Sequence, residues 1–220
     1  MIRRSALTTE WLRTGPDHAA ARLVLAHGAG AGMESRFLTA LADLLGARGL
    51  ATWRFEFAYM AARRRGGPRR PPPRADRLTG EFAEAVGAAA GPTPLLIGGK
   101  SMGGRVASLA ADELFRARAI QGLVAIGYPF HPPGRPGELR TAHLAALACP
   151  TLIVQGERDP FGSRPEVEAL DLPAAIRIHW MADGDHDLAP RRARQRAPQA
   201  HLVEAADAIA QFALSLAKRS

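Results

Sequence analysis

Apolar residues follow two different spacings along this chain. Short apolar runs of the kind that form buried strands occur at residues 22–27, 51–57, 93–98, 120–127, 150–155 and 174–180. Longer segments with apolar residues three or four positions apart, as on one face of a helix, occur at residues 34–48, 77–90, 102–116 and 198–218. Several short runs are apolar throughout, which is typical of strands covered by helices on both faces. The alternation predicts an α/β fold, a three-layer α/β/α sandwich with a mostly parallel central sheet.

Two loops interrupt this alternation. Residues 62–76 are rich in Arg, Pro and Gly, and residues 128–140 are rich in Pro. Neither has the character of a linker between domains, because strands and helices continue to alternate beyond each loop. A chain of 220 residues can bury a sizeable core. We therefore expect a single domain over residues 1–220.

The sharpest chemical signal lies where the apolar run at residues 93–98 meets the helical segment that starts at Met102. The connecting residues are Gly99-Lys100-Ser101-Met102-Gly103. A serine on so tight a strand-to-helix turn has a strained backbone, and side chains two positions before or after it would collide, so glycines are required there. A phosphate-binding loop is the alternative, but the Gly-x4-Gly-Lys-Ser spacing is missing. We interpret Ser101 as a nucleophile and the Met102 N–H as an oxyanion donor.

A serine nucleophile needs a histidine base and an acid that orients it. Asp159 follows the run at residues 150–155, and Glu157 is its nearest rival. His186 follows the last short run, in a turn that also carries Asp183, Asp185 and Asp187. Those carboxylates could suggest a metal site, but no second His or Cys completes an ordinary zinc spacing nearby. We predict a catalytic triad of Ser101, Asp159 and His186 and no metal.

The loop at residues 27–32 follows the first short run and contains mainly Gly and Ala. Small residues let backbone N–H groups approach a substrate closely, so Ala29, with Gly30 next, is the expected second oxyanion donor. A nucleotide-binding loop is the alternative. The stretch lacks the spaced G-x-G-x-x-G pattern, and no acidic residue ends the next strand. We expect His27 to anchor this loop rather than to bind a ligand.

With these residues in place, the chain resembles the α/β-hydrolase superfamily from residue 23 onward, and in particular its small lidless branch of hydrolases related to dienelactone hydrolases. The matching stretches are residues 27–33, 54–60, 98–104, 127–134, 155–159 and 184–187. The resemblance implies that Ser101, Asp159 and His186 form the triad and that Met102 and Ala29 donate to the oxyanion. Dienelactone hydrolases use a cysteine nucleophile, whereas this chain has Ser101, so the resemblance does not carry over their substrate.

These features predict a serine hydrolase that cleaves an ester, thioester or related acyl bond of a small molecule, without a cofactor. Only about 30 residues separate residue 127 from Asp159, which is too few for a helical lid. Loops should wall the site instead, and Tyr59, Met60, Phe130 and His131 are the expected substrate contacts, with ordinary loop packing as the alternative. A hydrolase-fold interaction module with little or no activity is the alternative function.

The charge of the chain is uneven. Its 29 basic and 21 acidic residues give a formal net charge of +8, and only Lys100 and Lys218 among the basic residues are lysines. Arginines cluster at residues 63–77 and 191–196. They could favour an anionic substrate or simply form a solvated face. The first cluster lacks interleaved aromatic residues that would stack on bases, so we expect no nucleic-acid partner.

The remaining features concern location. The first ten residues lack the apolar run of a signal peptide, and no stretch approaches the roughly 18 continuous apolar residues of a membrane helix. Cys149 is the single cysteine, so no internal disulfide can form. We expect a cytoplasmic protein without a membrane partner. The sequence does not indicate an oligomeric state.

Overall fold

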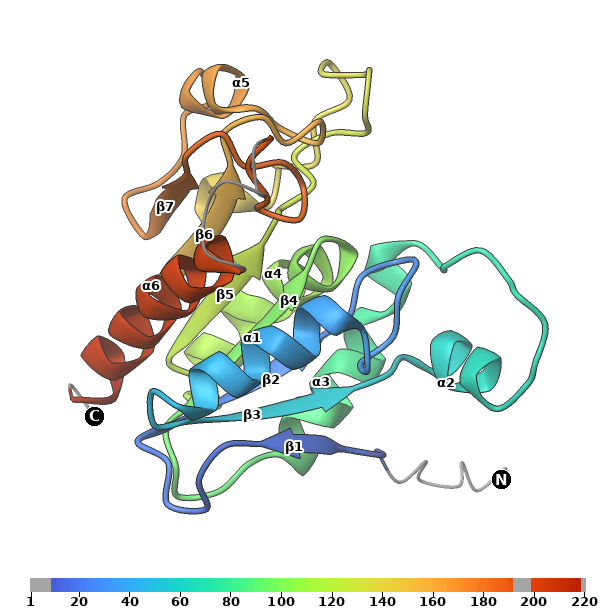
Figure 1. The fold of residues 1–220 in the computed structure, drawn as a ribbon, viewed down its shortest axis with the longest axis vertical. Helices are drawn as coiled ribbons and strands as arrows, with labels where there is room; N and C mark the ends of the chain where they lie inside the picture. The colour runs from blue at the N-terminus through green and yellow to red at the C-terminus, as the bar shows by residue number, and fades with distance from the viewer. Residues whose placement is uncertain (1–8, 192–198, 219–220) are drawn as a thin grey trace.

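The structure, a computed structural model, describes residues 9–191 and 199–218. A seven-stranded sheet runs through its centre in the order β1-β3-β2-β4-β5-β6-β7. The strands are β1 Leu12–Thr14, β2 Ala21–Ala26, β3 Leu50–Phe55, β4 Leu95–Lys100, β5 Gly122–Ile126, β6 Thr151–Gly156 and β7 Ile176–Met181. All neighbouring strands pair in parallel except β1, which is antiparallel to β3 at the sheet edge (Figure 1).

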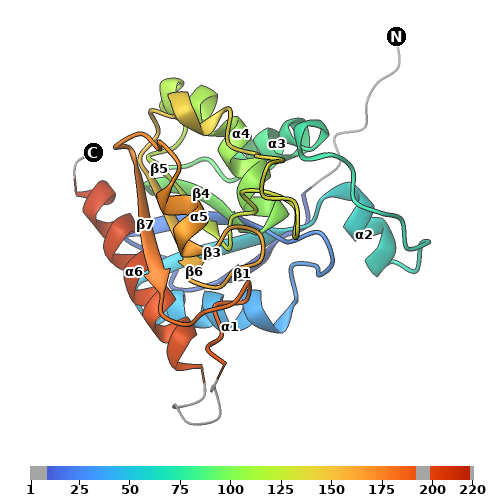
Figure 2. The same ribbon diagram turned by 90° about the horizontal axis from the view of Figure 1, so that it is seen from above.

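Helices cover both faces of this sheet. They are α1 Arg36–Gly46, α2 Ala58–Arg64, α3 Thr79–Ala88, α4 Met102–Arg116, α5 Arg164–Glu168 and α6 Ala200–Ala217. Figure 2 shows α1 and α6 on one side of the sheet and α3 and α4 on the other. The predicted three-layer α/β/α sandwich with a mostly parallel sheet is confirmed.

Alternation along the strands builds two separate cores. On β2, Leu23 and Leu25 face the cluster that includes α1 and α6, whereas Val24 and Ala26 face the cluster that includes α3 and α4. Successive side chains of a strand point to opposite faces, so a strand between two helix layers must be apolar at consecutive positions. This is why the runs recognised in the sequence are continuous rather than alternating.

Each predicted strand and helix has a counterpart, with ends shifted by a few residues. The segment predicted at residues 77–90 begins its α-helix two residues later, because Ala75–Arg77 forms a 3₁₀ turn first. The helix predicted at residues 198–218 is α6, and residue 198 lies outside the described residues. Three short elements, β1, α2 and α5, were not predicted. Each presents few buried residues, so its apolar pattern is weak.

The sheet topology gathers four chain segments at one edge. Because β4, β5, β6 and β7 are parallel, the segments that follow them all leave at the carboxyl ends of the strands. Ser101 follows β4, Gly127 follows β5, Asp159 lies in the turn after β6, and His186 follows β7. Ligands bind at this edge in open α/β sheets. Among the described helices, none is both long enough and apolar enough to cross a membrane.

Candidate active site

Ser101 sits at the turn between β4 and α4 with a strained backbone. Its φ of 52° and ψ of −117° lie where residues with a side chain are rarely found. The conformation is held because the Ser101 N–H donates to Ile126 O at 2.8 Å and the Arg105 N–H donates to Ser101 O at 3.1 Å. One bond belongs to the sheet side and the other to the first turn of α4. The neighbouring secondary structure therefore imposes the strain on the serine.

The glycines on either side of Ser101 are required by close backbone approach, as the sequence predicted. A Cβ on Gly99 would lie 2.3 Å from the Gly103 carbonyl carbon, and one on Gly103 would lie 2.5 Å from His27 O. Both contacts are with backbone, which cannot move aside cheaply. The turn thus packs directly against the loop that begins at His27.

His186 and Asp159 are in direct contact. The His186 Nδ1 lies 2.8 Å from Asp159 Oδ2, and the Asp159 side chain is fully buried, whereas that of His186 is 24 % exposed. A carboxylate accepts, so Nδ1 is the donor in this contact, and Nε2 is the ring nitrogen that the contact leaves unused. The Phe161 ring lies 4.4 Å from the imidazole, centroid to centroid, and fixes its plane further. This geometry leaves Nε2 available as a base.

Glu157, the alternative acid, has other partners. Its carboxylate pairs with Arg164 at 2.9 Å and accepts from the Asp183 N–H at 3.0 Å. These two contacts, the backbone bond first, lower the pKa of Glu157. The Glu157 carboxylate is therefore engaged by Arg164 and by the Asp183 backbone. Asp159 is the carboxylate that contacts the His186 ring.

Gln155, which the sequence analysis missed, holds the acid in place. It is fully buried at the end of β6, and its Nε2 donates to Asp159 Oδ2 at 3.1 Å and to Gly162 O at 3.1 Å. Its Oε1 accepts from the Tyr128 N–H at 2.7 Å. The Phe161 N–H also donates to Asp159 Oδ1 at 2.8 Å. The sequence signal was a polar residue ending an otherwise apolar buried run.

Lys100, next to the serine, joins the elbow to the histidine turn. Its Nζ donates to His186 O at 2.7 Å and lies 3.3 Å from Asp187 Oδ1. Burial lowers the pKa of Lys100, and the charge of Asp187 opposes that effect. Gly127 lies against the histidine turn, where there is no room for a side chain. A Cβ at this position would lie 2.9 Å from His186 O and 3.3 Å from His186 Cε1.

Ser101 is therefore brought to the same sheet edge as His186. In the described part of the chain, the Ser101 hydroxyl and the His186 ring do not share a hydrogen bond. In hydrolases generally, the hydrogen bond between a serine nucleophile and its base is often long before a substrate binds and tightens afterwards.

The remaining acids of the histidine turn serve structure. Asp183 pairs with Arg158 at 2.6 Å, and Asp185 Oδ1 accepts from the N–H groups of Asp187 at 2.9 Å and Ala189 at 3.0 Å. The carboxylate oxygens of Asp183 and Asp185 thus hold the turn in shape through these contacts rather than being directed at one point.

His27 anchors the loop at residues 27–32, as the sequence predicted. Its Nδ1 donates to Gly28 O at 2.7 Å, and its Nε2 accepts from the Phe57 N–H at 3.2 Å. Both ring nitrogens are thus used by backbone, which fixes the neutral tautomer protonated at Nδ1. Burial lowers the pKa of His27, which favours the same neutral form.

Helix α2 supports the same loop from the outside. The Tyr59 hydroxyl donates to Ala29 O at 3.3 Å, and Arg63 Nη1 donates to Gly30 O at 3.3 Å. Burial raises the pKa of Tyr59 to about 12, so its hydroxyl stays protonated and able to donate. Tyr59 and Arg63 thus contact carbonyl oxygens of the loop. The Ala29 N–H, which is the expected oxyanion donor, is a different group and takes no part in these two hydrogen bonds.

The expected substrate contacts divide into two groups. Tyr59 is half-buried beside the Ala29 loop, and Met60 lines a cavity of about 270 Å³ next to Gly30. Phe130 is fully buried and His131 is 3 % exposed. The His131 ring donates to Pro132 O at 2.8 Å and faces Glu166 at 3.4 Å. Phe130 and His131 thus pack within their own loop, and their contact with a substrate stays a prediction.

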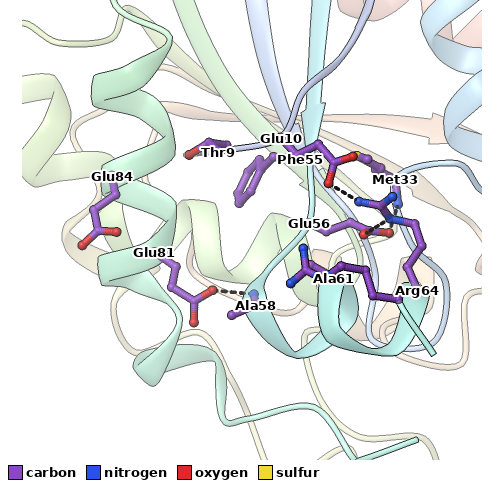
Figure 3. Close-up of a pocket in the computed structure, with 11 residues that line it drawn as sticks. Thr9, Glu10, Met33, Phe55, Glu56, Ala58, Ala61, Arg64, Glu81 and Glu84 are labelled. Atoms are coloured by element: carbon purple, nitrogen blue, oxygen red, sulfur yellow. Dashed lines mark hydrogen bonds and ion pairs between the residues drawn. The ribbon is translucent and has the colours of Figure 1, made fainter. Parts of the chain in front are cut away.

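A second cavity, of about 370 Å³, lies between the end of β3, α2 and α3 (Figure 3). Figure 3 shows Arg64 between two carboxylates, Glu56 at 2.7 Å and Glu10, while Glu81 accepts from the Ala58 N–H at 2.7 Å. Arg64, which belongs to the arginine cluster at residues 63–77, therefore forms structural ion pairs with Glu56 and Glu10. Of the second cluster, Arg191 faces Asp183 at 3.7 Å, and Arg192, Arg194 and Arg196 lie outside the described residues.

Comparison with known proteins places the fold. The family model described as an alpha/beta hydrolase domain matches residues 19–214. Est1E from Butyrivibrio proteoclasticus, solved with ferulic acid, superposes with a TM-score of 0.68 at 15% identity, covering 94% of this chain and 95% of that one. A lidless α/β serine hydrolase from Xanthomonas campestris gives 0.63 at 18% identity, covering 93% and 87%.

A dienelactone hydrolase from Anabaena variabilis superposes with a TM-score of 0.64 at 23% identity, covering 96% of this chain and 91% of that one. No curated protein sequence matches the chain significantly. At these identities the solved structures are evidence for the fold alone.

Proposed function

The chain belongs to the alpha/beta hydrolase domain family, and from that premise we propose that it is a serine hydrolase acting on an ester, thioester or related acyl bond. The proposed triad is Ser101, His186 and Asp159, and the proposed oxyanion donors are the N–H groups of Met102 and Ala29.

The observation that carries this proposal is the 2.8 Å contact between His186 Nδ1 and the buried Asp159 carboxylate, at the strand edge where Ser101 occupies its strained turn. A buried carboxylate that orients an imidazole, with the other imidazole nitrogen available, is the arrangement that activates a serine hydroxyl. The chain order of serine, acid and histidine is also that of this fold.

In the first step, His186 Nε2 accepts the proton of the Ser101 hydroxyl as Oγ bonds to the acyl carbon. Asp159 stabilises the imidazolium that forms. The carbonyl electron pair moves onto oxygen, giving a tetrahedral oxyanion. The leaving alcohol or thiol then departs with the proton from His186, and the acyl group remains on Ser101 as an ester.

The second step repeats this sequence with water. His186 takes a proton from the water as its oxygen attacks the acyl-enzyme, and Ser101 leaves with that proton to release the acid. In both steps the oxyanion faces two backbone donors. The Met102 N–H belongs to the first turn of α4, where N–H groups have no partner within the helix. Each such donor contributes about 3–4 kcal/mol of transition-state stabilisation.

A labelling experiment tests the proposal directly. A fluorophosphonate probe, which reacts with activated serines, should label the wild-type protein and give no signal with Ser101→Ala. His186→Gln and Asp159→Asn should label at least about a thousand times more slowly, as expected for loss of a triad member. The same proteins should be assayed against p-nitrophenyl esters and acyl thioesters of increasing chain length, which identifies the bond cleaved.

Ser215→Ala is the matched control, because Ser215 lies on α6, away from the proposed triad, and its hydroxyl donates to Phe212 O of the same helix at 2.7 Å. That variant should label as wild type does. Labelling that persists in Ser101→Ala would assign the nucleophile elsewhere. A wild-type protein that neither labels nor turns over any substrate would favour the alternative, an interaction module built on the hydrolase fold.

A further inference from the structure

Gln155 is fully buried near the end of β6, shortly before the turn that carries Asp159. A buried amide costs free energy unless both its oxygen and its nitrogen find partners. The Gln155 Oε1 accepts from the Tyr128 N–H at 2.7 Å, and its Nε2 lies 3.2 Å from Tyr128 O. The same Nε2 lies 3.1 Å from Asp159 Oδ2 and 3.1 Å from Gly162 O. The amide therefore joins the loop after β5 to the turn after β6.

The Gln155 side chain continues the pairing of β5 with β6 beyond the paired residues. Ile126 and Val154 are the last residues in register, and the Gly127 N–H still donates to Val154 O at 2.9 Å. At Gly127 the chain turns with a φ of 58°. The next residue, Tyr128, then meets the side chain of Gln155 with both its N–H and its carbonyl oxygen. The position of the amide is thus fixed from the edge of the sheet.

The partners of Gln155 also determine which way its amide faces. The Tyr128 N–H can only donate, so the amide oxygen must face it. The Gly162 carbonyl and the Asp159 carboxylate accept, so the amide nitrogen must face them. A flipped amide would set its oxygen against these acceptors and its N–H groups against a donor. Gln155 therefore presents an N–H to Asp159 in one orientation only.

The Asp159 carboxylate receives this N–H on the oxygen that also contacts the histidine. Its Oδ2 lies 3.1 Å from Gln155 Nε2 and 2.8 Å from His186 Nδ1. Its Oδ1 accepts from the Phe161 N–H at 2.8 Å. A planar carboxylate can rotate about its bond to Cβ, and a donor on each oxygen stops that rotation. Phe161 fixes Oδ1, and Gln155 fixes Oδ2 independently of the imidazole.

Thr151, at the start of the same strand, makes a contact of a different kind. It is also buried, with 1% of its surface exposed, and its hydroxyl donates to Cys149 O at 2.8 Å. This bond satisfies a buried group within two residues and does not lead to the site. The two polar side chains of β6 thus offer a matched pair, one bonded locally and one bonded to the acid.

We propose that Gln155 is a positioning residue for the reaction of Ser101, because it holds Asp159 Oδ2 toward His186 and thereby keeps the proton of the neutral imidazole on Nδ1. The tautomer with its proton on Nε2 cannot accept the serine proton there. The described contacts of Gln155 reach Asp159 but not the imidazole, so it acts through the acid. Its effect on rate rests on the proposed function, whereas its effect on the tautomer does not require hydrolysis.

Kinetics of Gln155→Met and of the control Thr151→Val test the effect on rate. Gln155→Met keeps the length of the side chain but removes the donor to Asp159. We expect kcat for a p-nitrophenyl ester and the rate of fluorophosphonate labelling to fall by about tenfold to a hundredfold, because small displacements between reacting groups are costly. KM should stay unchanged, since a residue that acts through the acid contributes to the transition state only. Thr151→Val should match wild type in both constants.

A double-mutant cycle separates action through the acid from a general structural role. If Gln155 acts through Asp159, adding Gln155→Met to Asp159→Asn should slow labelling by less than about twofold more, because the two substitutions remove one shared effect. Slowing by the same factor in both backgrounds would overturn the proposal.

Nitrogen-15 NMR of the histidine rings measures the tautomer without a substrate, with His186 assigned by its absence from His186→Gln. Wild type and Thr151→Val should hold the neutral ring protonated at Nδ1, and Gln155→Met should populate the Nε2 form. Circular dichroism reports folding. Gln155→Asn, which is one methylene shorter and cannot reach both Tyr128 and Asp159, replaces Gln155→Met if that variant does not fold.

The proposal is overturned if Gln155→Met labels as fast as Thr151→Val, or if its His186 ring keeps the wild-type tautomer. A wild-type protein that does not label contradicts the hydrolase proposal instead. In that case the NMR measurement decides by itself whether Gln155 orients His186 through the acid, so the two failures are distinguishable.

Discussion

The buried amine of Lys100 donates a 2.7 Å hydrogen bond to the main-chain oxygen of His186. Lys100 immediately precedes Ser101 in the chain, so one side chain fixes the distance between the turn of the proposed nucleophile and the turn of the proposed base. The ion pair with Asp187 at 3.3 Å closes the contact on its outer side.

Replacing Lys100 with methionine removes this connection while keeping most of the buried volume. We expect kcat/KM for an activated ester to fall by about tenfold to a hundredfold, because small displacements between reacting groups are costly in rate. Lys218→Met, at the other lysine of the chain, lies at the exposed end of α6 and should leave kinetics unchanged. A Lys100→Met protein with wild-type kcat/KM would show that the two turns keep their distance without the amine.

The apolar runs predicted most of the fold, because buried parallel strands are apolar on both faces and this property can be recognised in the local sequence. The same runs predicted where Asp159 and His186 lie, since the segments that follow parallel strands all begin at the carboxyl edge of the sheet. The sequence did not reveal α2. That helix has seven residues, only Met60 among them is buried, and its arginines conceal the helical spacing.

The contacts that support the site were harder to foresee because they join residues far apart in sequence. Gln155 reaches Asp159 within one turn, yet its role depends on the Tyr128 backbone lying beside it. The orientation of Phe130 was likewise invisible, because an aromatic residue in a loop can face the site or the core, and here Gly162 leaves room for it to turn inward. A Cβ on Gly162 would lie 2.7 Å from the Phe130 ring.

The strained backbone of Ser101 predicts an unusual stability result. Ser101→Gly should raise the free energy of unfolding by about 1 kcal/mol, since relief of roughly 1–3 kcal/mol of strain exceeds the 0.5–1 kcal/mol entropy cost of glycine. Ser101→Ala keeps the Cβ and should unfold like wild type. Urea denaturation of the three proteins measures the difference. Equal stability of the Gly and Ala variants would mean that the φ of 52° carries no strain.

Two glycines in helices should respond to alanine in opposite directions. In Gly103→Ala the new Cβ meets His27 O at 2.5 Å and Ala26 O at 2.7 Å, so we expect a loss of about 2 kcal/mol or more from overpacking against backbone. Gly87, near the end of α3, has nothing within 4 Å of the position that a Cβ would take. Gly87→Ala should therefore gain about 0.5–1 kcal/mol from helix propensity. Thermal denaturation compares the pair, and destabilisation of similar size in both would contradict the close approach at Gly103.

The tautomer of His27 predicts how stability depends on pH. In the folded protein its Nε2 accepts from Phe57 N–H and its Nδ1 donates to Gly28 O, so a second proton would break the Phe57 contact. Burial lowers the folded pKa of His27 below its ordinary value of 6.5. As pH falls through about 6.5, the unfolded chain takes up the proton first, and the free energy of unfolding decreases until the lowered folded pKa is reached.

Glutamine at position 27 can donate through its amide and accept through its oxygen without titrating. We therefore expect His27→Gln to show a shallower loss of stability below pH 6.5 than wild type, measured by urea denaturation between about pH 5 and 8, the range in which histidine changes charge. Burial also lowers the pKa of His143 and His201, which contribute equally to both proteins and cancel in the difference. His18→Gln, at an exposed histidine, is the control and should follow wild type. Parallel curves for wild type and His27→Gln would mean that His27 is not held neutral by these two bonds.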